Sequence, residues 1–195
     1  MRIASSAHTE QPWLIHEITR DFRVEDVWAL PTPGGPDDFP VLLSAMEGES
    51  FEHGGPVAAR ALWWLRWKLG AVLGLDRRAS GLGARVHTLR DRLPAELREQ
   101  APAEQNDGSP FSVVYQVHNE RAAEIANRTV HAVLHLGWVP DGAGGWHGQM
   151  AILVKPNGAL GAAYMALIKP FRKLIIYPAI LRAIERRWQD QPDHA

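Results

Sequence analysis

The sequence predicts an α+β domain with a helix-grip arrangement, in which a curved antiparallel sheet wraps on a long C-terminal helix. Segments rich in β-branched and aromatic residues follow one another between residues 111 and 155, separated by short turns, as is typical of antiparallel strands. Residues 159–188 then carry apolar side chains at helical spacing. Strands gathered between helices indicate the α+β class.

The length of 195 residues favours one domain over residues 1–195, with about the first 12 residues as a loose arm. Residues 23–30 read as a strand, and the Pro- and Gly-rich stretch 31–38 as a loop. We expect short helices at 39–47 and 94–100, and a longer one from Pro56 to about Gly74. Residues 81–94 give an ambiguous pattern that could form a strand before the second short helix.

The second half of the chain gives a clearer pattern. Residues 111–117, 128–139 and 146–155 are expected strands. Helix-forming residues at 121–127 suggest a brief helical turn that ends at Asn127 in a left-handed conformation. The last helix contains Pro170 and Pro178, and each should kink it, bending it around the sheet.

Composition excludes several classes of protein. The net charge of −1 gives no support for nucleic-acid binding, and the absence of cysteine removes disulfides and thiolate chemistry. The N-terminus lacks an apolar signal core, so we expect a cytoplasmic protein. Residues 57–75 approach the length of a membrane span, but Arg60, Arg66 and Lys68 within them favour a packed helix over a transmembrane segment.

Charge is unevenly distributed along the chain. Residues 10–53 hold ten acidic residues and only two basic ones, whereas residues 155–188 hold seven basic residues and one acidic one. Either the two segments are neighbours in the fold, which we favour, or the basic helix faces an anionic ligand or membrane.

Several segments together resemble the bacterial family known as domain of unknown function 2867. They occur in the family's order and cover nearly the whole chain: "DVWALPTPGGPDDFP", "LWWLRWKLG", "EIANRTVHAVLHLGWV", "GQMAILVKPNG", "YMALIKPFRKLIIYP" and "RRW". The resemblance implies a relationship to the SRPBCC superfamily, whose START-like and polyketide-cyclase-like domains bind ligands. It also implies that some members follow a nicotinamide-binding domain, but "GLG" at 81–83 lacks the remainder of the dinucleotide fingerprint, so we expect no cofactor here.

Alternation along the strand at 128–139 separates two faces. Val130, Ala132, Leu134, Leu136 and Trp138 form an apolar face that should point to the core, while His131 and His135 point away from it. His118 and His147 fall on the corresponding polar sides of the neighbouring strands. The four histidines are therefore expected to be solvent-exposed, with a homodimer interface or a metal or catalytic cluster as alternatives.

A metal site built on this strand alone is excluded by geometry. His131 and His135 would lie about 13 Å apart at the backbone, at ~3.3 Å per residue, while a zinc ion needs nitrogens at about 2 Å. We expect no metal site.

Arg128 is the one charge on the apolar face and needs an anionic partner if it is buried, either Glu124 or a ligand, unless it sits at the frayed strand end. Aromatic residues with polar tips suit a pocket wall as well as an ordinary core. The candidate ligand-binding residues are therefore Tyr115, Arg128, Trp138, Tyr164 and Arg172.

The leading hypothesis is a protein that holds a small, apolar or amphipathic ligand in a cavity between the sheet and the C-terminal helix. An enzyme of the cyclase or hydrolase kind, with a pocket His or Tyr as general acid or base, is the less favoured alternative because the histidines face away from that cavity. A third hypothesis is a peripheral membrane role for the basic C-terminal helix, which carries Trp188.

Overall fold

A computed structural model describes residues 1–47, 86–100, 111–127 and 129–191, except for the side chains of Glu47, Leu160, Tyr164 and Phe171. The strands are β1 (Arg2–Ile3), β2 (Arg23–Ala29), β3 (Ser112–Gln116), β4 (Glu120–Ala126), β5 (Val130–Pro140) and β6 (Trp146–Pro156). The helices are α1 (Ser6–Thr9), α2 (Ile15–Ile18), α3 (Phe39–Glu47), α6 (Ala95–Gln100), α7 (Gly158–Phe171) and α8 (Tyr177–Gln189), with the 3₁₀ turn η2 (Leu89–Arg92) and the π-helical turn η3 (Arg172–Ile176). The helix expected at 56–74 lies outside the described residues.

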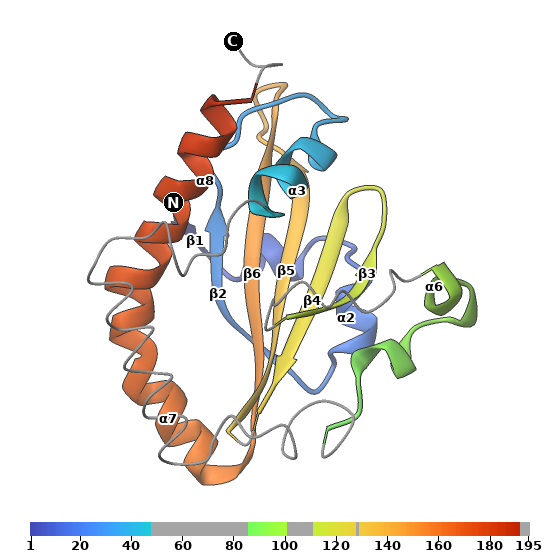
Figure 1. The fold of residues 1–195 in the computed structure, drawn as a ribbon, viewed down its shortest axis with the longest axis vertical. Coiled ribbons are helices and arrows are strands. Elements are labelled where there is room, and N and C mark those ends of the chain that lie inside the picture. Colours follow the sequence, from blue (N-terminus) through green and yellow to red (C-terminus); the bar gives the residue numbers. More distant parts are fainter. Residues whose placement is uncertain (48–85, 101–110, 128, 192–195) are drawn as a thin grey trace.

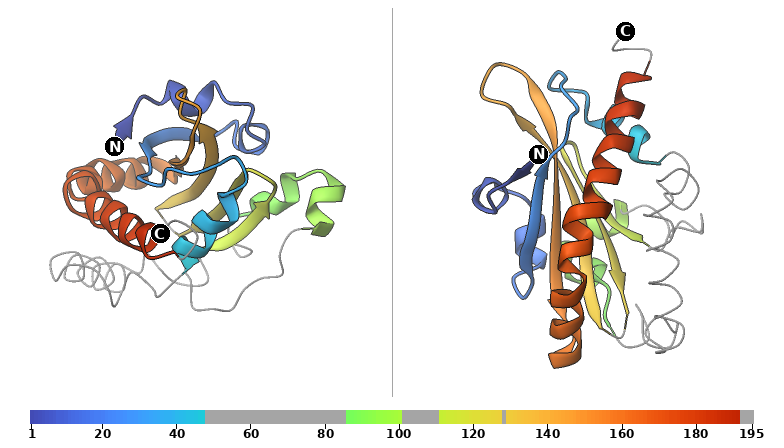
Figure 2. Two further views of the ribbon diagram at one scale, coloured as in Figure 1. Left: turned by 90° about the horizontal axis from the view of Figure 1, so that it is seen from above. Right: turned by 90° about the vertical axis from the view of Figure 1, so that its left-hand side faces the viewer.

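The strands form one antiparallel sheet in the order β1-β2-β6-β5-β4-β3. The C-terminal helix runs along one side of it (Figure 1), and the sheet curves between this helix and the N-terminal elements (Figure 2). The predicted α+β class and the helix-grip arrangement are therefore confirmed.

The longest ladder joins β5 to β6, which pair from Val130 with Pro156 to Pro140 with Trp146. Their turn is closed by Asp141, whose Oδ1 accepts hydrogen bonds from the backbone N–H groups of Ala143 and Gly145. Gly142 and Gly144 adopt φ angles of 79° and 99°, which glycine tolerates without steric cost. This turn fixes the register of the hairpin that carries the histidines.

The helical turn predicted at 121–127 is wrong, because Glu120–Ala126 forms strand β4. Every residue of β4 pairs with β5, from Glu120 opposite Gly137 to Ala126 opposite His131. Ladder pairing and cross-strand contacts outweigh the helix propensity of the alanines. Asn127 does not adopt a left-handed conformation; its side-chain Oδ1 instead accepts hydrogen bonds from Thr129 and the N–H of Val130 between the two strands.

Each face of the sheet is covered by its own apolar cluster. The face toward the C-terminal helix packs against α3 and α8 through the cluster Trp28, Leu30, Phe39, Leu42, Leu43, Leu136, Trp138, Met150, Tyr177, Ile184 and Trp188. The opposite face packs against α2, η2 and their flanks through Trp13, Ile15, Ile18, Val27, Leu89, Leu93, Val114, Tyr115, Ala122, Val133, Val139, Ala151 and Leu153. The alternation predicted for β5 is correct, but the face that carries His131 and His135 is buried as well.

The N-terminal segment forms part of this second layer, not the loose arm expected for it. Arg2 and Ile3 pair with Trp28 and Val27 of β2, and His8 is completely buried. Gly137 allows Trp13 to lie flat on β5, since a Cβ at residue 137 would meet the Trp13 ring at 2.7 Å. The segment is therefore held by both backbone pairing and side-chain packing.

The C-terminal helix bends along the sheet (Figure 1). The bend falls where η3 interrupts it between Pro170 and Pro178, because proline removes a backbone donor and disturbs the regular helical ladder. The π-helical turn brings Arg172 and Lys173 over the acidic residues of β2.

Candidate functional site

Two histidine–carboxylate pairs lie side by side on the face of the sheet away from the C-terminal helix. His135 Nε2 is 2.8 Å from Glu120 Oε2, and His131 Nε2 is 2.6 Å from Glu124 Oε2. Each histidine stands two residues before the β5 residue that pairs with its glutamate. The same diagonal geometry is therefore used twice along one strand pair. The expectation that these histidines are solvent-exposed is wrong: His131 is 3% exposed and His135 is 1% exposed.

The His131 pair is anchored from η2. Glu124 accepts hydrogen bonds from the Thr88 hydroxyl and from the backbone N–H of Leu89, which lies 3.1 and 3.2 Å from its two oxygens. Because Glu124 accepts from Thr88 and Leu89, the imidazole Nε2–H of His131 is the donor in its contact with Glu124. The edge of the Phe22 ring packs against the imidazole, with centroids 4.9 Å apart.

The His135 pair is enclosed by the N-terminal segment. Glu120 also accepts hydrogen bonds from the Tyr115 hydroxyl and from Leu14 N–H, each at 2.9 Å. His135 Nδ1 lies 3.1 Å from His8 Nε2. Because Glu120 accepts from His135 Nε2–H, His135 Nδ1 must accept from His8, which leaves the buried His8 Nδ1 without a hydrogen-bond partner.

Burial sets the pKa values in this sealed network. Desolvation, reinforced by the neighbouring His135 and His16, lowers the pKa of His8 to about 3. Burial also lowers the pKa of His135, although Glu120 opposes the shift. Burial would raise the pKa of Glu120, but hydrogen bonds from His135, Leu14 and Tyr115 lower it overall. At neutral pH the network is one carboxylate with neutral imidazoles.

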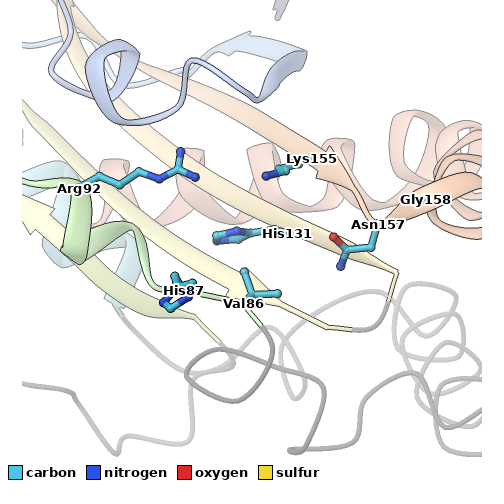
Figure 3. Close-up of a pocket in the computed structure, with 7 residues that line it drawn as sticks. All are labelled: Val86, His87, Arg92, His131, Lys155, Asn157 and Gly158. Carbon is cyan, nitrogen blue, oxygen red and sulfur yellow. The ribbon is translucent and has the colours of Figure 1, made fainter.

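The His131 pair, by contrast, borders a pocket of about 430 Å³ (Figure 3). The lining comes from the segment before and within η2, from β5, from the end of β6 and from the start of α7: Val86, His87, Arg92, His131, Lys155, Asn157 and Gly158. Lys155 pairs directly with His131 across the strands, so both side chains lie on one face. Arg92 and Lys155 point toward one another beside His131 (Figure 3).

Both cations of the pocket share one carboxylate. Arg92 binds Asp21 with two hydrogen bonds, of 2.6 and 3.1 Å, and Lys155 Nζ lies 2.8 Å from Asp21 Oδ2. The hydrogen bond from Arg92, followed by that from Lys155, lowers the pKa of Asp21 despite some burial. Asp21 therefore stays ionised between the two cations, and Glu124 behind His131 is a second carboxylate that interacts with Arg92.

Of the five residues predicted to bind ligand, the three whose side chains are described, Tyr115, Trp138 and Arg172, do not lie together in one site. Tyr115 is buried in the sealed network, where burial and Glu120 raise the pKa of its hydroxyl. Trp138 lies on the opposite face of the sheet, packs against Trp188 and donates a hydrogen bond from Nε1 to the carbonyl of Gly35. Arg128 and the side chain of Tyr164 lie outside the described part of the chain.

Arg172 lies on the helix-facing side of the sheet, where it pairs with acidic residues of β2. Its Nη2 is 3.2 Å from Glu25 and 3.7 Å from Asp26, and Lys169 and Lys173 join the same two carboxylates. Burial would raise the pKa of Glu25, but Arg172 and the neighbouring cations lower it overall. The predicted proximity of the acidic N-terminal and basic C-terminal segments is confirmed.

The pocket residues Arg92, Lys155 and Asn157 were not predicted as site residues. Lys155 could have been found from alternation, because strand pairing with β5 sets it beside His131. No sequence pattern marks Arg92, which reaches the pocket through a 3₁₀ turn 39 residues before His131 in the chain.

The remaining histidines do not share one environment. His118 is exposed and His147 is half-buried, with its pKa lowered by burial. Over residues 1–47, 86–100, 111–127 and 129–191, no group of three His, Asp or Glu side chains is arranged to hold a metal ion. Within the same ranges, no helix combines the length and apolar character that crossing a membrane requires.

A family model for a protein of unknown function, DUF2867, matches residues 18–179. The chain belongs to the DUF2867 family. The match includes β2, the whole sheet apart from β1, and the C-terminal helix as far as the start of α8. Comparisons with curated proteins and with solved structures give no significant match. The family therefore supplies no activity, and function must be argued from the DUF2867 fold and its pocket.

Proposed function

We propose that this DUF2867 protein binds a small amphipathic molecule with an anionic group in the pocket beside His131. The observation that carries the proposal is the shared use of Asp21 by Arg92 and Lys155. Both side chains carry more N–H groups than their bonds to Asp21 use, so charged donors remain at the pocket wall. A ligand carboxylate or phosphate would accept charge-assisted hydrogen bonds from these donors.

The size and lining of the pocket support the same ligand class. A volume of about 430 Å³ falls within the range of small-molecule sites, roughly 300–1,000 Å³. Val86 contributes an apolar wall opposite the cations, and Phe22 packs against the ring of His131. A molecule with an acidic head and a short apolar body fits this distribution better than a wholly apolar one.

The proposal places the ligand on the opposite side of the sheet from the cavity expected between the sheet and the C-terminal helix. On the helix side, the described aromatic residues Trp28, Trp138 and Trp188 pack within one buried cluster. The relationship to START-like ligand-binding domains remains part of the proposal, and the sheet-and-helix arrangement supports it.

A charge-removal experiment tests the proposal. Binding of benzoate, hexanoate and phenylpyruvate to the full chain is followed by ligand-observed NMR, for wild type, Lys155→Met and Lys169→Met. Lys169 is the matched control because it has almost the same exposure as Lys155, 48% against 46%, and also pairs with one acidic residue, but on the other face. We expect Lys155→Met to weaken binding about tenfold or more, since hydrogen bonds between charged groups contribute about 1.5–3 kcal/mol.

Lys169→Met should bind like the wild type. The proposal fails if none of the three anions binds, or if the two lysine variants weaken binding equally.

A further inference from the structure

We propose that His131 is a general base that removes a proton from the carbon next to the carbonyl group of a bound oxo acid. The inference rests on the proposed binding function and names an activity for the same pocket. Its substrate class is a small carboxylic acid that also carries a ketone.

The hydrogen bonds of His131 support its role as a base, because they leave one ring nitrogen to accept a proton. Nε2 donates to Glu124, which two further donors from η2 hold in place. With Nε2–H donating to Glu124, Nδ1 is the ring nitrogen that can accept a proton, and the described residues provide no hydrogen-bond partner for it. His131 also lines the pocket, so Nδ1 is the ring nitrogen left for a ligand. Glu124 is a positioning residue, which fixes the tautomer and offsets the positive charge of the imidazolium once His131 is protonated.

Arg92 and Lys155 meet the second requirement of this reaction, which is stabilisation of the negative charge that develops on the carbonyl oxygen. Removing a proton beside a carbonyl breaks the C–H bond and moves its electron pair into the carbonyl group, which forms an enolate. The proton passes to His131 Nδ1, and the negative charge develops on the carbonyl oxygen. Arg92 and Lys155 lie on the same pocket wall and would stabilise that oxygen and hold the carboxylate. Return of a proton from His131 restores the ketone, so the step needs neither oxidant nor co-reactant.

Acyl transfer through a covalent intermediate fits this site less well. None of the seven described lining residues is a Ser, Thr or Tyr, and the chain has no cysteine. A positioned base beside two cations, with no hydroxyl or thiol nucleophile among the seven described lining residues, favours proton transfer at carbon.

The sealed pair, His135 with Glu120, provides an internal control for the proposed role of His131 as a base. His135 has the same kind of carboxylate partner in the same diagonal register, but it does not line the pocket. Its Nδ1 is occupied by His8. A glutamine at either histidine position can keep a hydrogen bond to its glutamate while removing the base.

The experiment measures exchange of the C3 protons of pyruvate, 2-oxobutyrate and phenylpyruvate for deuterium in D₂O by ¹H NMR. It uses the full chain as wild type, His131→Gln and His135→Gln, and each sample is also measured for binding of the same acids and for folding by circular dichroism. We expect wild type to accelerate exchange, and His131→Gln to retain binding while slowing exchange at least about 100-fold, the lower end of general-base contributions. His135→Gln should exchange like the wild type. If either variant fails to fold, His131→Asn replaces His131→Gln, and His118→Gln, at an exposed histidine outside the pocket lining, replaces His135→Gln.

Binding without exchange above the His131→Gln background overturns the inference and leaves the proposed function standing. Equal exchange by wild type and His131→Gln overturns it as well. If none of the three oxo acids binds while benzoate or hexanoate does, the inference fails and the proposed function stands. Absence of binding by every acid in both experiments overturns both.

Discussion

The two histidine–carboxylate pairs of this protein share one register but differ in their surroundings. His135–Glu120 is closed off by the N-terminal segment, through His8 and Trp13. His131–Glu124 lies four residues further back along β5 and borders a pocket with two cations. The strand pair thus repeats one polar unit, and the elements packed over it determine what each copy can do.

The contrast shows why a buried polar pair is ambiguous evidence of function. Both glutamates accept one side-chain hydroxyl and one backbone N–H besides their histidine. In the sealed pair, every hydrogen-bonding atom of His135 is used within the protein. In the pocket pair, one imidazole nitrogen remains for an external partner. The predictions below test this difference, from the largest expected effect to the smallest.

The first prediction removes each carboxylate in turn. Glu120→Ala and Glu124→Ala should each lower the free energy of unfolding by about 3–5 kcal/mol, because each leaves buried donors without an acceptor. Urea unfolding followed by circular dichroism measures the effect. Only Glu124 variants should alter ligand binding, so the milder Glu120→Gln and Glu124→Gln are compared in the binding assay. A loss below about 1 kcal/mol for Glu120→Ala would show that the sealed network is not structural.

The second prediction concerns the seal itself. Gly137→Ala places a Cβ 2.7 Å from the Trp13 ring, so Trp13 must shift from β5. We expect a loss of about 1–3 kcal/mol in unfolding free energy, typical of overpacking. The same substitution in a Trp13→Phe background should cost less, because the smaller ring lacks the colliding atoms. Equal costs in the two backgrounds would exclude this contact as the cause.

The third prediction is a pH dependence that belongs to the sealed side. The folded pKa of His8 is about 3, below its ordinary value of 6.5, so between these values the unfolded chain binds a proton that the folded chain does not. Stability is therefore fully present above pH 6.5 and falls on acidification toward pH 3, by at most about 1.4 kcal/mol per pH unit for this group.

His8→Gln can still donate to His135 but does not titrate, so its unfolding free energy should fall less steeply from pH 6.5 to 5. Denaturant unfolding at several pH values measures both slopes. Identical slopes in wild type and His8→Gln would contradict the pKa assigned to the buried imidazole.

Most of the strands and the final helix are predicted by local sequence patterns, but the pocket beside His131 is not. The strands at 111–117, 128–139 and 146–155 and the final helix are predicted from side-chain alternation and helical spacing, which burial on one face imposes directly. The sequence of β4 misleads, because Ala122, Ala123 and Ala126 favour a helix and only pairing with β5 makes them a strand.

The two faces of β5 show more clearly what side-chain alternation alone does not predict. Alternation correctly separates His131 and His135 from Leu136 and Trp138, yet it cannot reveal that a second layer covers the histidines. That layer comes from residues near the N-terminus and from η2, far away in sequence. Arg92 and Asp21 meet only in the folded chain, so the pocket they form has no sequence signature.

The most direct test of the account is the state of the two imidazoles, measured by long-range ¹H–¹⁵N NMR of the histidine side chains. Both His131 and His135 should show the tautomer with the proton on Nε2. Addition of phenylpyruvate should shift the Nδ1 resonance of His131 and leave that of His135 unchanged. Equal shifts at both histidines, or a shift at His135 alone, would contradict the assignment of one sealed and one open pair.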